Sequence, residues 1–339
     1  MTALHAGGVS VPRVAGDHVV ATESCLPEHV ADVGGKAVGL ASLLQAGQRV
    51  PASFVITAGA YRDFVRSRPH RMSTAVREAI ARAYSSLSER GGAELTVAVR
   101  SSATVEDAAE ASWAGQFQTF LGISGTDEVL ASVEQCWAAA LAPHVGAYRA
   151  GRRVDEDGGV AVIVQELVNA RISGVMFTQH PKTGDRSLVV IESSYGLGEA
   201  VVGGEVTPDL IEVNKITGQR HHARLGAKHR EHRLTPDRRG VQSILVDPQR
   251  QQDWSISEQE VAALVTMAAE LEARLGRGLD VEWAIGATEN GDGEESMFAL
   301  QVRPITVKHA RPQTSAGQHR DSIDHILGLL SGHQRGDAR

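Results

Sequence analysis

Two carboxylates, an amide and an arginine lie at strand-like spacing within residues 279–303. Alternation of polar and apolar side chains puts Asp280 and Glu282 on one face of a first strand, and Gln301 and Arg303 on one face of a second. Carboxylate and amide oxygens are ligands that suit Mg²⁺, and the planar guanidinium of arginine suits phosphate. If the apolar faces of both strands pack on one core, these four side chains form a site for a metal–nucleotide complex.

The two strands are separated by strong turn chemistry. Residues 290–293 read Asn-Gly-Asp-Gly, and Pro304 ends the second strand. A structural alternative stays open for this hairpin, because an antiparallel sheet commonly turns one polar face to water.

A lysine near the N-terminus follows two glycines. Gly34 and Gly35 precede Lys36, and from Lys36 the apolar residues recur with helical spacing as far as Gly47. The lysine is therefore expected in the first turn of a helix, where free backbone N–H groups attract anions. The spacing is not that of a P-loop, and an ordinary surface loop is the alternative.

A further candidate for phosphate binding is Arg100, which we expect at the end of a strand over 95–100. Small and hydroxyl-bearing residues follow, and such a segment suits a mobile loop over phosphates. Within it, Gly115 would allow close backbone approach and Thr119 would offer a hydroxyl. The alternative is a structural ion pair between Arg100 and Glu106 or Asp107.

The remaining segments predict a mixture of strands and helices. The apolar run 160–168 predicts a buried strand, and its polar residues Gln165 and Glu166 could form a hinge between lobes whose edge groups read an adenine. Further strands are predicted over 50–57, 172–178, 188–192 and 210–214, and helices over 36–47, 57–65, 73–87, 132–149 and 258–275. The basic segment 219–253 contains histidines without metal-ligand spacing, and we expect a solvated excursion there.

Composition excludes several classes of protein. The chain has 339 residues, a net charge of −7 and 4% aromatic residues, so a nucleic-acid-binding protein is not expected. No apolar run is long enough to span a membrane, and no signal peptide is recognised. Cys25 and Cys136 have no metal or redox spacing and are expected to be buried free thiols. We therefore expect a cytoplasmic protein without a membrane partner.

Several motifs, taken together and in order, resemble one family over about residues 30–307. They are Gly34-Gly35-Lys36, the runs 97–107, 112–121, 174–178 and 195–199, and the hairpin with Asp280, Glu282, Gln301, Arg303 and Pro304. The resemblance is to the N-terminal ATP-binding domain of phosphoenolpyruvate synthase and pyruvate phosphate dikinase, also found in rifampin phosphotransferase. It implies an α+β, ATP-grasp-like fold with two lobes enclosing a nucleotide cleft.

The composition of the chain and this resemblance together indicate a domain plan. Residues 1–17 would be an N-terminal arm, residues 18–309 the ATP-binding domain with a hinge near 165–175, and residues 310–339 a polar tail. Ala108, Ala109 and Trp113 depart from the family pattern and put the packing of the phosphate loop in doubt. No histidine has the setting of the family's phosphohistidine, so we do not expect the covalent relay within this chain.

The family's roles carry over to matching positions. Phosphates would be held by Lys36, Arg100 and Arg303, which are the expected catalytic residues. The loop over the phosphates would use Gly115, Thr119 and Phe120, and the adenine would meet Gln165, Glu166 and Leu167. Mg²⁺ would be held by Glu282 and Gln301, with Asp280 nearby.

The expected function is transfer of a phosphoryl group from Mg–ATP to a small-molecule acceptor, which needs mainly positioning and charge neutralisation. One alternative is the ATP-binding component of a split dikinase that phosphorylates a separate phosphohistidine protein and forms AMP. Others are a non-catalytic nucleotide-binding regulator and ligation through an acyl phosphate. The general base is not identified, and Glu199, His180 and Asp209 are candidates.

Overall fold

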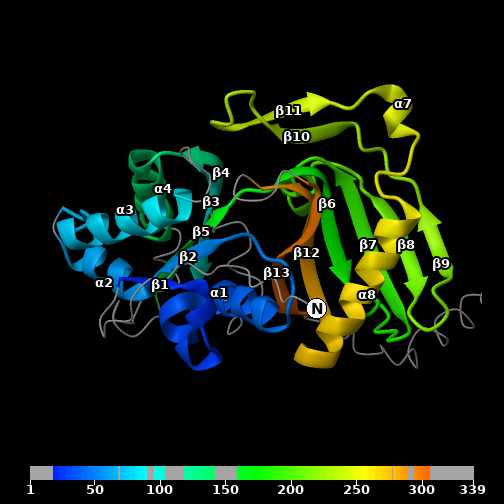
Figure 1. Cartoon of the computed structure of the whole chain (residues 1–339), viewed down its shortest axis with the longest axis horizontal. Helices are drawn as coiled ribbons and strands as arrows, with labels where there is room; N and C mark the ends of the chain where they lie inside the picture. The colour runs from blue at the N-terminus through cyan, green and yellow to red at the C-terminus, as the bar shows by residue number, and fades with distance from the viewer. Residues whose placement is uncertain are drawn as a thin grey trace, which may run out of the picture. The chain divides into compact units, whose positions relative to one another are not determined.

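The computed structural model describes residues 18–67, 69–89, 95–103, 118–141, 159–276, 278–288 and 294–305. Contacts divide the chain into a unit of Met1–Ile305 and a unit of Thr306–Arg339, and every described residue lies in the first unit. The predicted arm 1–17, the tail 310–339 and the loop residue Gly115 lie outside the described residues. Helices and antiparallel sheets combine in the first unit, which confirms the predicted α+β class (Figure 1).

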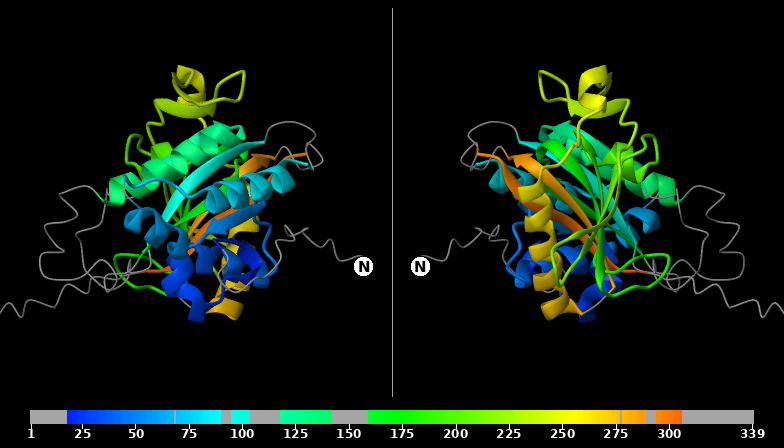
Figure 2. Two further views of the ribbon diagram at one scale, coloured as in Figure 1. Left: turned by 90° about the vertical axis from the view of Figure 1, so that its left-hand side faces the viewer. Right: turned by 90° about the vertical axis from the view of Figure 1, so that its right-hand side faces the viewer.

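The first sheet has five strands and is buried on both faces. In spatial order its strands are β1 (Val19–Ala21), β2 (Ser53–Ile56), β5 (Val160–Glu166), β3 (Thr96–Ala103) and β4 (Thr119–Ser124). Helices α2 (Ala58–Arg66), α3 (Thr74–Ser88) and α4 (Thr126–Ala140) cover one face (Figures 1 and 2). Val160, Val162 and Val164 of β5 pack in that cluster, whereas Ala161 and Ile163 pack in the cluster on the other face. This double burial is the physical reason for the continuous apolar run in β5.

The second sheet has six antiparallel strands. In spatial order its strands are β13 (Ser296–Pro304), β12 (Leu279–Ala287), β6 (Asn169–Phe177), β7 (Leu188–Tyr195), β8 (Asp209–Asn214) and β9 (Arg220–Arg224). Helix α8 (Glu258–Leu275) packs on one face (Figures 1 and 2). A capping box between Ser257 and Glu260 starts the helix, and Gly276 at φ 93° ends it, so the boundaries predicted for α8 are confirmed.

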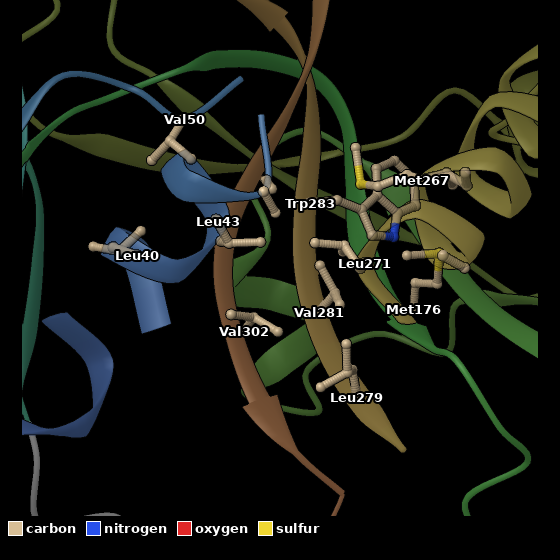
Figure 3. Packing of buried hydrophobic residues seen from close by; sticks show 14 of the residues in the cluster. Leu40, Leu43, Val50, Met176, Met267, Leu271, Leu279, Val281, Trp283 and Val302 are labelled. Atoms are coloured by element: carbon tan, nitrogen blue, oxygen red, sulfur yellow. The ribbon is translucent and has the colours of Figure 1, made fainter. Parts of the chain in front are cut away.

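Helix α1 (Val30–Gln45) joins the two sheets through a shared core. Its residues Leu40 and Leu43 belong to the same cluster as Val302 of β13 and Met267 and Leu271 of α8 (Figure 3). The helix approaches β13 so closely that a Cβ on Gly39 would lie 2.5 Å from the carbonyl oxygen of Val302.

The other elements are short. They are the 3₁₀ turns η1 (Thr22–Ser24) and η2 (Pro27–His29), α6 (Glu199–Val202), α7 (Pro248–Gln251), and the hairpin β10 (Arg230–Leu234)–β11 (Val241–Leu245). The prediction that 219–253 is only a solvated excursion was wrong, because Leu234 and Val241 of this hairpin pack in an apolar cluster with Leu197 and Phe298. At the hairpin tip, Thr96 Oγ1 of β3 donates to the carbonyl oxygen of Arg238 at 3.2 Å.

Three predicted boundaries were also wrong. Strand β3 continues past Arg100 to Ala103 because its last residues still pair with β5. Helix α1 begins before Lys36, with a break at Gly34, where φ is 77°. Helix α4 begins at Thr126 rather than at residue 132, with two acids in its first turn, and residues 142–149 lie outside the described residues.

Candidate active site

The strands β12 and β13 bring the four predicted polar residues together. They pair antiparallel, as the sequence predicts, with Asp280 directly opposite Arg303 and Glu282 directly opposite Gln301. Directly opposed residues of an antiparallel pair project from the same face. By regular alternation Trp283 lies with Val281 on the α8 side, where it is fully buried, and a register shift between Glu282 and Trp283 places Ala299 opposite Trp283.

The face of the second sheet opposite α8 is called the polar face below. On it, Arg303 Nε and Nη2 both lie 2.8 Å from Oδ2 of Asp280. Burial raises the pKa of the Asp280 carboxyl above its ordinary value, Arg303 opposes that rise, and the charge of Glu282 adds to it. Two neighbouring carboxylates on a partly desolvated surface favour a cation between or beside them.

The carboxylate of Glu282 is paired with an arginine from the first sheet. Arg100 Nη2 of β3 donates to Oε2 of Glu282 at 2.7 Å, and the two side chains are 19% and 17% exposed. The acids Glu106 and Asp107, considered above as structural partners of Arg100, lie outside the described residues. Residues 182 positions apart are thus joined by one charged contact, which links the two sheets at the polar face.

The Gly-Gly-Lys segment packs against the same strand as Arg100. Lys36 Nζ donates to the carbonyl oxygen of Ser101 at 3.2 Å. Gly34 lies so close to β3 that a Cβ on it would be 2.2 Å from Oγ of Ser102. The segment is therefore a docked structure rather than an ordinary surface loop, and it holds Lys36 beside the strand that carries Arg100.

Residues predicted to line the nucleotide lie on neighbouring strands of the first sheet. Thr119 of β4 is directly opposite Arg100, and Phe120 is opposite Val99. On β5, Gln165 is 3% exposed, and its Nε2 has no hydrogen-bond partner among the described residues. A buried amide donor without an acceptor is costly unless a ligand supplies one.

The end of β5 offers the nucleotide fewer backbone donors than the sequence suggests. The N–H of Glu166 donates to Ala52, and the N–H of Leu167 donates to Thr96. A base bound there would therefore meet the carbonyl oxygens and side chains of these residues, not their N–H groups.

The structure separates the three candidates for a general base. Asp209 is excluded, because it is fully buried and its oxygens accept from Lys228 Nζ, Gly226 N and both N and Oγ of Ser255. His180 accepts two backbone hydrogen bonds at Nδ1, with Nε2 3.7 Å from Glu212. Glu199 lies 3.4 Å from His232.

The sequence reasoning missed one carboxylate on the polar face. Glu192 of β7 is separated from Glu282 by a single residue of β6, Val175, which lies directly opposite both. Its signal was present in the sequence, because Glu192 directly follows four apolar residues and is the one charged residue of its strand.

Comparisons with known proteins bear on this site. The family model described as "Pyruvate phosphate dikinase, AMP/ATP-binding domain" matches residues 67–322. A probable phosphoenolpyruvate synthase from Archaeoglobus fulgidus is 35% identical over 81% of this chain and 40% of that protein. A rifampicin phosphotransferase from Streptomyces sviceus is 33% identical over 90% of this chain and 37% of that protein.

Two more similar proteins complete the comparison. The prodigiosin synthesizing transferase PigC of Serratia marcescens is 34% identical over 83% of this chain and 32% of that protein. The chain thus spans between about a third and two fifths of the length of these relatives. Among solved structures, D-alanyl-alanine synthetase A from Vibrio cholerae is 10% identical over 81% of this chain and 58% of that chain, with a TM-score of 0.32.

Proposed function

Because the chain belongs to the family of pyruvate phosphate dikinase AMP/ATP-binding domains, which its motifs had indicated, we propose that it binds Mg–ATP and transfers a phosphoryl group to a small-molecule acceptor. The observation that carries the proposal is the charged array across the two sheets. Arg100 from β3 pairs with Glu282, and Arg303 from β13 pairs with Asp280, on one face. Lys36 is held beside the same strand as Arg100.

These ion pairs are suited to exchange partners. Without nucleotide, each arginine neutralises a carboxylate. With Mg–ATP, the arginines can turn to phosphate oxygens and the carboxylates to the cation, so no charge is left alone in either state. A planar guanidinium makes this exchange at low cost because carboxylate and phosphate present similar oxygen spacings, and both can accept two hydrogen bonds from it.

The donor set fits Mg²⁺ of a nucleotide complex rather than a permanently bound ion. Within the described ranges, no group of three or more His, Cys, Asp or Glu side chains is arranged to hold a metal. Mg²⁺ is commonly held by one or two carboxylates, with substrate phosphates and water completing its shell. Asp280, Glu282 and the amide of Gln301 would supply that protein share, and the ion would neutralise charge on the phosphates.

The chain's own residues would position the reactants. Lys36, Arg100 and Arg303 would balance the charge that moves when the acceptor oxygen bonds to the γ-phosphorus. In the same step the bond to the β,γ-bridging oxygen breaks, and ADP leaves with that electron pair. Gln165 would give its unpartnered N–H to a ring nitrogen of the base, with Glu166 and Leu167 at its edge. Thr119 and Phe120 would lie at the phosphate end.

A second candidate is favoured by the relatives named phosphoenolpyruvate synthase. In it, the phosphoryl group passes from this domain to a histidine of a separate phosphohistidine protein, and AMP is formed. A non-catalytic regulator is the third possibility and would form neither ADP nor AMP.

Nucleotide products separate these functions. The protein is incubated with Mg–ATP and with host extract divided into small-molecule and macromolecular fractions, and the nucleotides are resolved by chromatography. We expect ADP with the small-molecule fraction, and its loss in Glu282→Gln. The matched control is Glu272→Gln, which removes an equally buried carboxylate from an ion pair with Lys215 away from the polar face. AMP that forms only with macromolecules would establish the second candidate, and no product with either fraction would contradict both.

A further inference from the structure

The base end of the proposed nucleotide site is closed in this structure. Gln165 is 3% exposed, although its Nε2 has no hydrogen-bond partner among the described residues. It lies directly opposite Ala98 of β3, and alternation along β3 puts Thr96, Ala98 and Arg100 on one face. A nucleobase can therefore reach the unpartnered amide only after the segment that covers this face of the first sheet has moved.

The segment that covers this face is the hairpin β10–β11 (Figure 1). Leu234 and Val241 are directly opposite each other in the hairpin, and both pack in one apolar cluster with Ala98. At the tip, the carbonyl oxygen of Arg238 accepts the hydrogen bond from Thr96. The hairpin therefore covers the part of β3 that lies beside the unpartnered amide.

The end of the hairpin nearest the second sheet is firmly anchored. The carbonyl oxygen of His232 accepts from the N–H of Leu197 at 2.8 Å, next to a parallel bridge between His232 and Gly196. The neighbouring carboxylate of Glu231 is 2% exposed and lies 3.0 Å from the guanidinium of Arg250. Removing this end from the second sheet would leave a buried charge without compensation, so the anchored end stays in place.

The tip of the hairpin docks on the first sheet through contacts that can be broken and remade. Thr96 Oγ1 donates to Arg238 at 3.2 Å, and a Cβ on Gly122 of β4 would lie 2.6 Å from the backbone of Gly240. These two contacts are here named the latch. Neither contact of the latch buries a charge, so its release leaves no charge uncompensated. With one end anchored and the other docked, the hairpin can pivot about the second sheet.

We propose that the hairpin β10–β11 is a gate for the nucleotide. The tip leaves Thr96 and Gly122, the base enters as far as Gln165, and the tip then closes over the bound nucleotide. The open state is rarely populated because Leu234 and Val241 leave their apolar cluster in it. Opening therefore limits the rates at which nucleotide enters and leaves. The proposal rests on the nucleotide binding proposed above and adds how access to that site is controlled.

Two substitutions loosen the latch at residues outside the proposed phosphate and base contacts. Thr96→Val removes the donor to Arg238 and nearly keeps the shape of the side chain. Gly122→Ala places a methyl group where the backbone of Gly240 lies. The matched control is Gly218→Ala, where φ is 68° against 74° at Gly122 and the space around the Cβ is open. The control therefore carries similar backbone strain without displacing the hairpin.

Stopped-flow binding of a fluorescent, ribose-labelled ATP analogue with Mg²⁺ tests the gate. In the wild type the observed rate should reach a plateau as the nucleotide concentration rises, because opening then limits binding. The plateau should rise about fivefold in Thr96→Val and at least about tenfold in Gly122→Ala, and change less than about twofold in Gly218→Ala. Release, followed by displacement with unlabelled ATP, should speed up by the same factors. The Kd should therefore stay within about twofold of the wild-type value.

The outcomes separate a gate from a fixed wall and from loss of the site. With a fixed wall, the observed rate would rise linearly with nucleotide concentration, and the variants Thr96→Val and Gly122→Ala would show faster release alone and a weaker Kd. Either that result or equal plateaus in the wild type and both variants would overturn the gate. Thr96→Val alone carries the comparison if Gly122→Ala does not fold. Absence of nucleotide binding in the wild type would instead overturn the proposed function, and the gate with it.

Discussion

The contact between Arg100 and Glu282 should be strong without nucleotide and weak with it. It joins the two sheets at 2.7 Å with both side chains less than one fifth exposed. At an effective dielectric constant near 20, two unit charges about 4 Å apart attract by roughly 4 kcal/mol. Desolvation offsets much of that attraction. We expect a coupling free energy of about 1–3 kcal/mol between the two side chains in the nucleotide-free protein.

A double-mutant cycle measures this coupling directly. Urea unfolding of the wild type, Arg100→Gln, Glu282→Gln and the double variant gives the coupling as the non-additive part of the four free energies of unfolding. Repeated with saturating Mg²⁺ and a non-hydrolysable ATP analogue, the coupling should fall below about 0.5 kcal/mol, because Arg100 then contacts phosphate and Glu282 contacts the cation.

The same cycle on Lys215 and Glu272 is the matched control. Their side chains are each 14% exposed and 2.8 Å apart, on β8–β9 and α8, away from the polar face. Their coupling should be of similar size and should not respond to nucleotide. An Arg100–Glu282 coupling that stays unchanged with Mg–ATP would refute the exchange of partners on which the proposed site depends.

Four further outcomes follow from the structure. Gly34→Ala should lower the free energy of unfolding by about 2–4 kcal/mol, from a φ of 77° and contact with Ser102, whereas Gly35→Ala, with open space around it, should not destabilise; equal effects in urea unfolding would contradict the docked loop. Lys36→Ala should weaken Mg–ATP binding about tenfold in calorimetry, and an unchanged affinity would remove Lys36 from the phosphate site. Because the pKa of Asp280 is raised above its ordinary value of 3.8, the folded state keeps a proton at pH values just above 3.8 that the unfolded state has lost, and the stability of the wild type falls as the pH rises through this range. The stability of Asp280→Asn relative to the wild type should therefore rise over the same range. A difference that does not depend on pH would be evidence against burial as the cause. Burial raises the pKa of Cys25 and of Cys136 to about 12, so both thiols should react with a disulfide reagent at pH 8 only after unfolding, and rapid labelling of the native protein would contradict their buried placement.

The sequence predicted the elements whose apolar pattern directly reflects the faces that they bury. Helix α8 has an apolar stripe toward the second sheet and a capping box at its start, and its boundaries follow from those two features. Strand β5 is buried on both faces and reads as an apolar run. Helix α1 was harder to delimit, because Gly34 breaks its backbone to approach Ser102, a contact 68 residues away that local pattern does not contain.

In the candidate site, too, contacts between residues near in the sequence were easier to predict than contacts between the two sheets. Alternation predicts that Asp280, Glu282, Gln301 and Arg303 share one face, but the pairing of Glu282 with Gln301 also needs a register shift between Glu282 and Trp283, which alternation does not indicate. Pairing of Arg100 with Glu282 depends on how two sheets meet through α1, and no spacing in the sequence indicates it. None of the described helices is long and apolar enough to cross a bilayer.

Asp209 and Glu282 illustrate why a carboxylate cannot be assigned from its residue type alone. Asp209 receives a lysine and three other donors in a fully buried setting, so all its lone pairs are used and removing Lys228 would leave a charge without compensation. Glu282 has one arginine partner and keeps part of its surface exposed. The buried arrangement around Asp209 stabilises the fold, since replacing any of its partners would leave a buried charge or a buried donor without compensation. Glu282 can exchange its arginine partner for a cation without leaving an uncompensated charge, provided that Arg100 binds an anion at the same time. A phosphate bound with its metal ion supplies both replacements at once, and this is the physical reason to expect the site to favour the metal–nucleotide complex over either component alone.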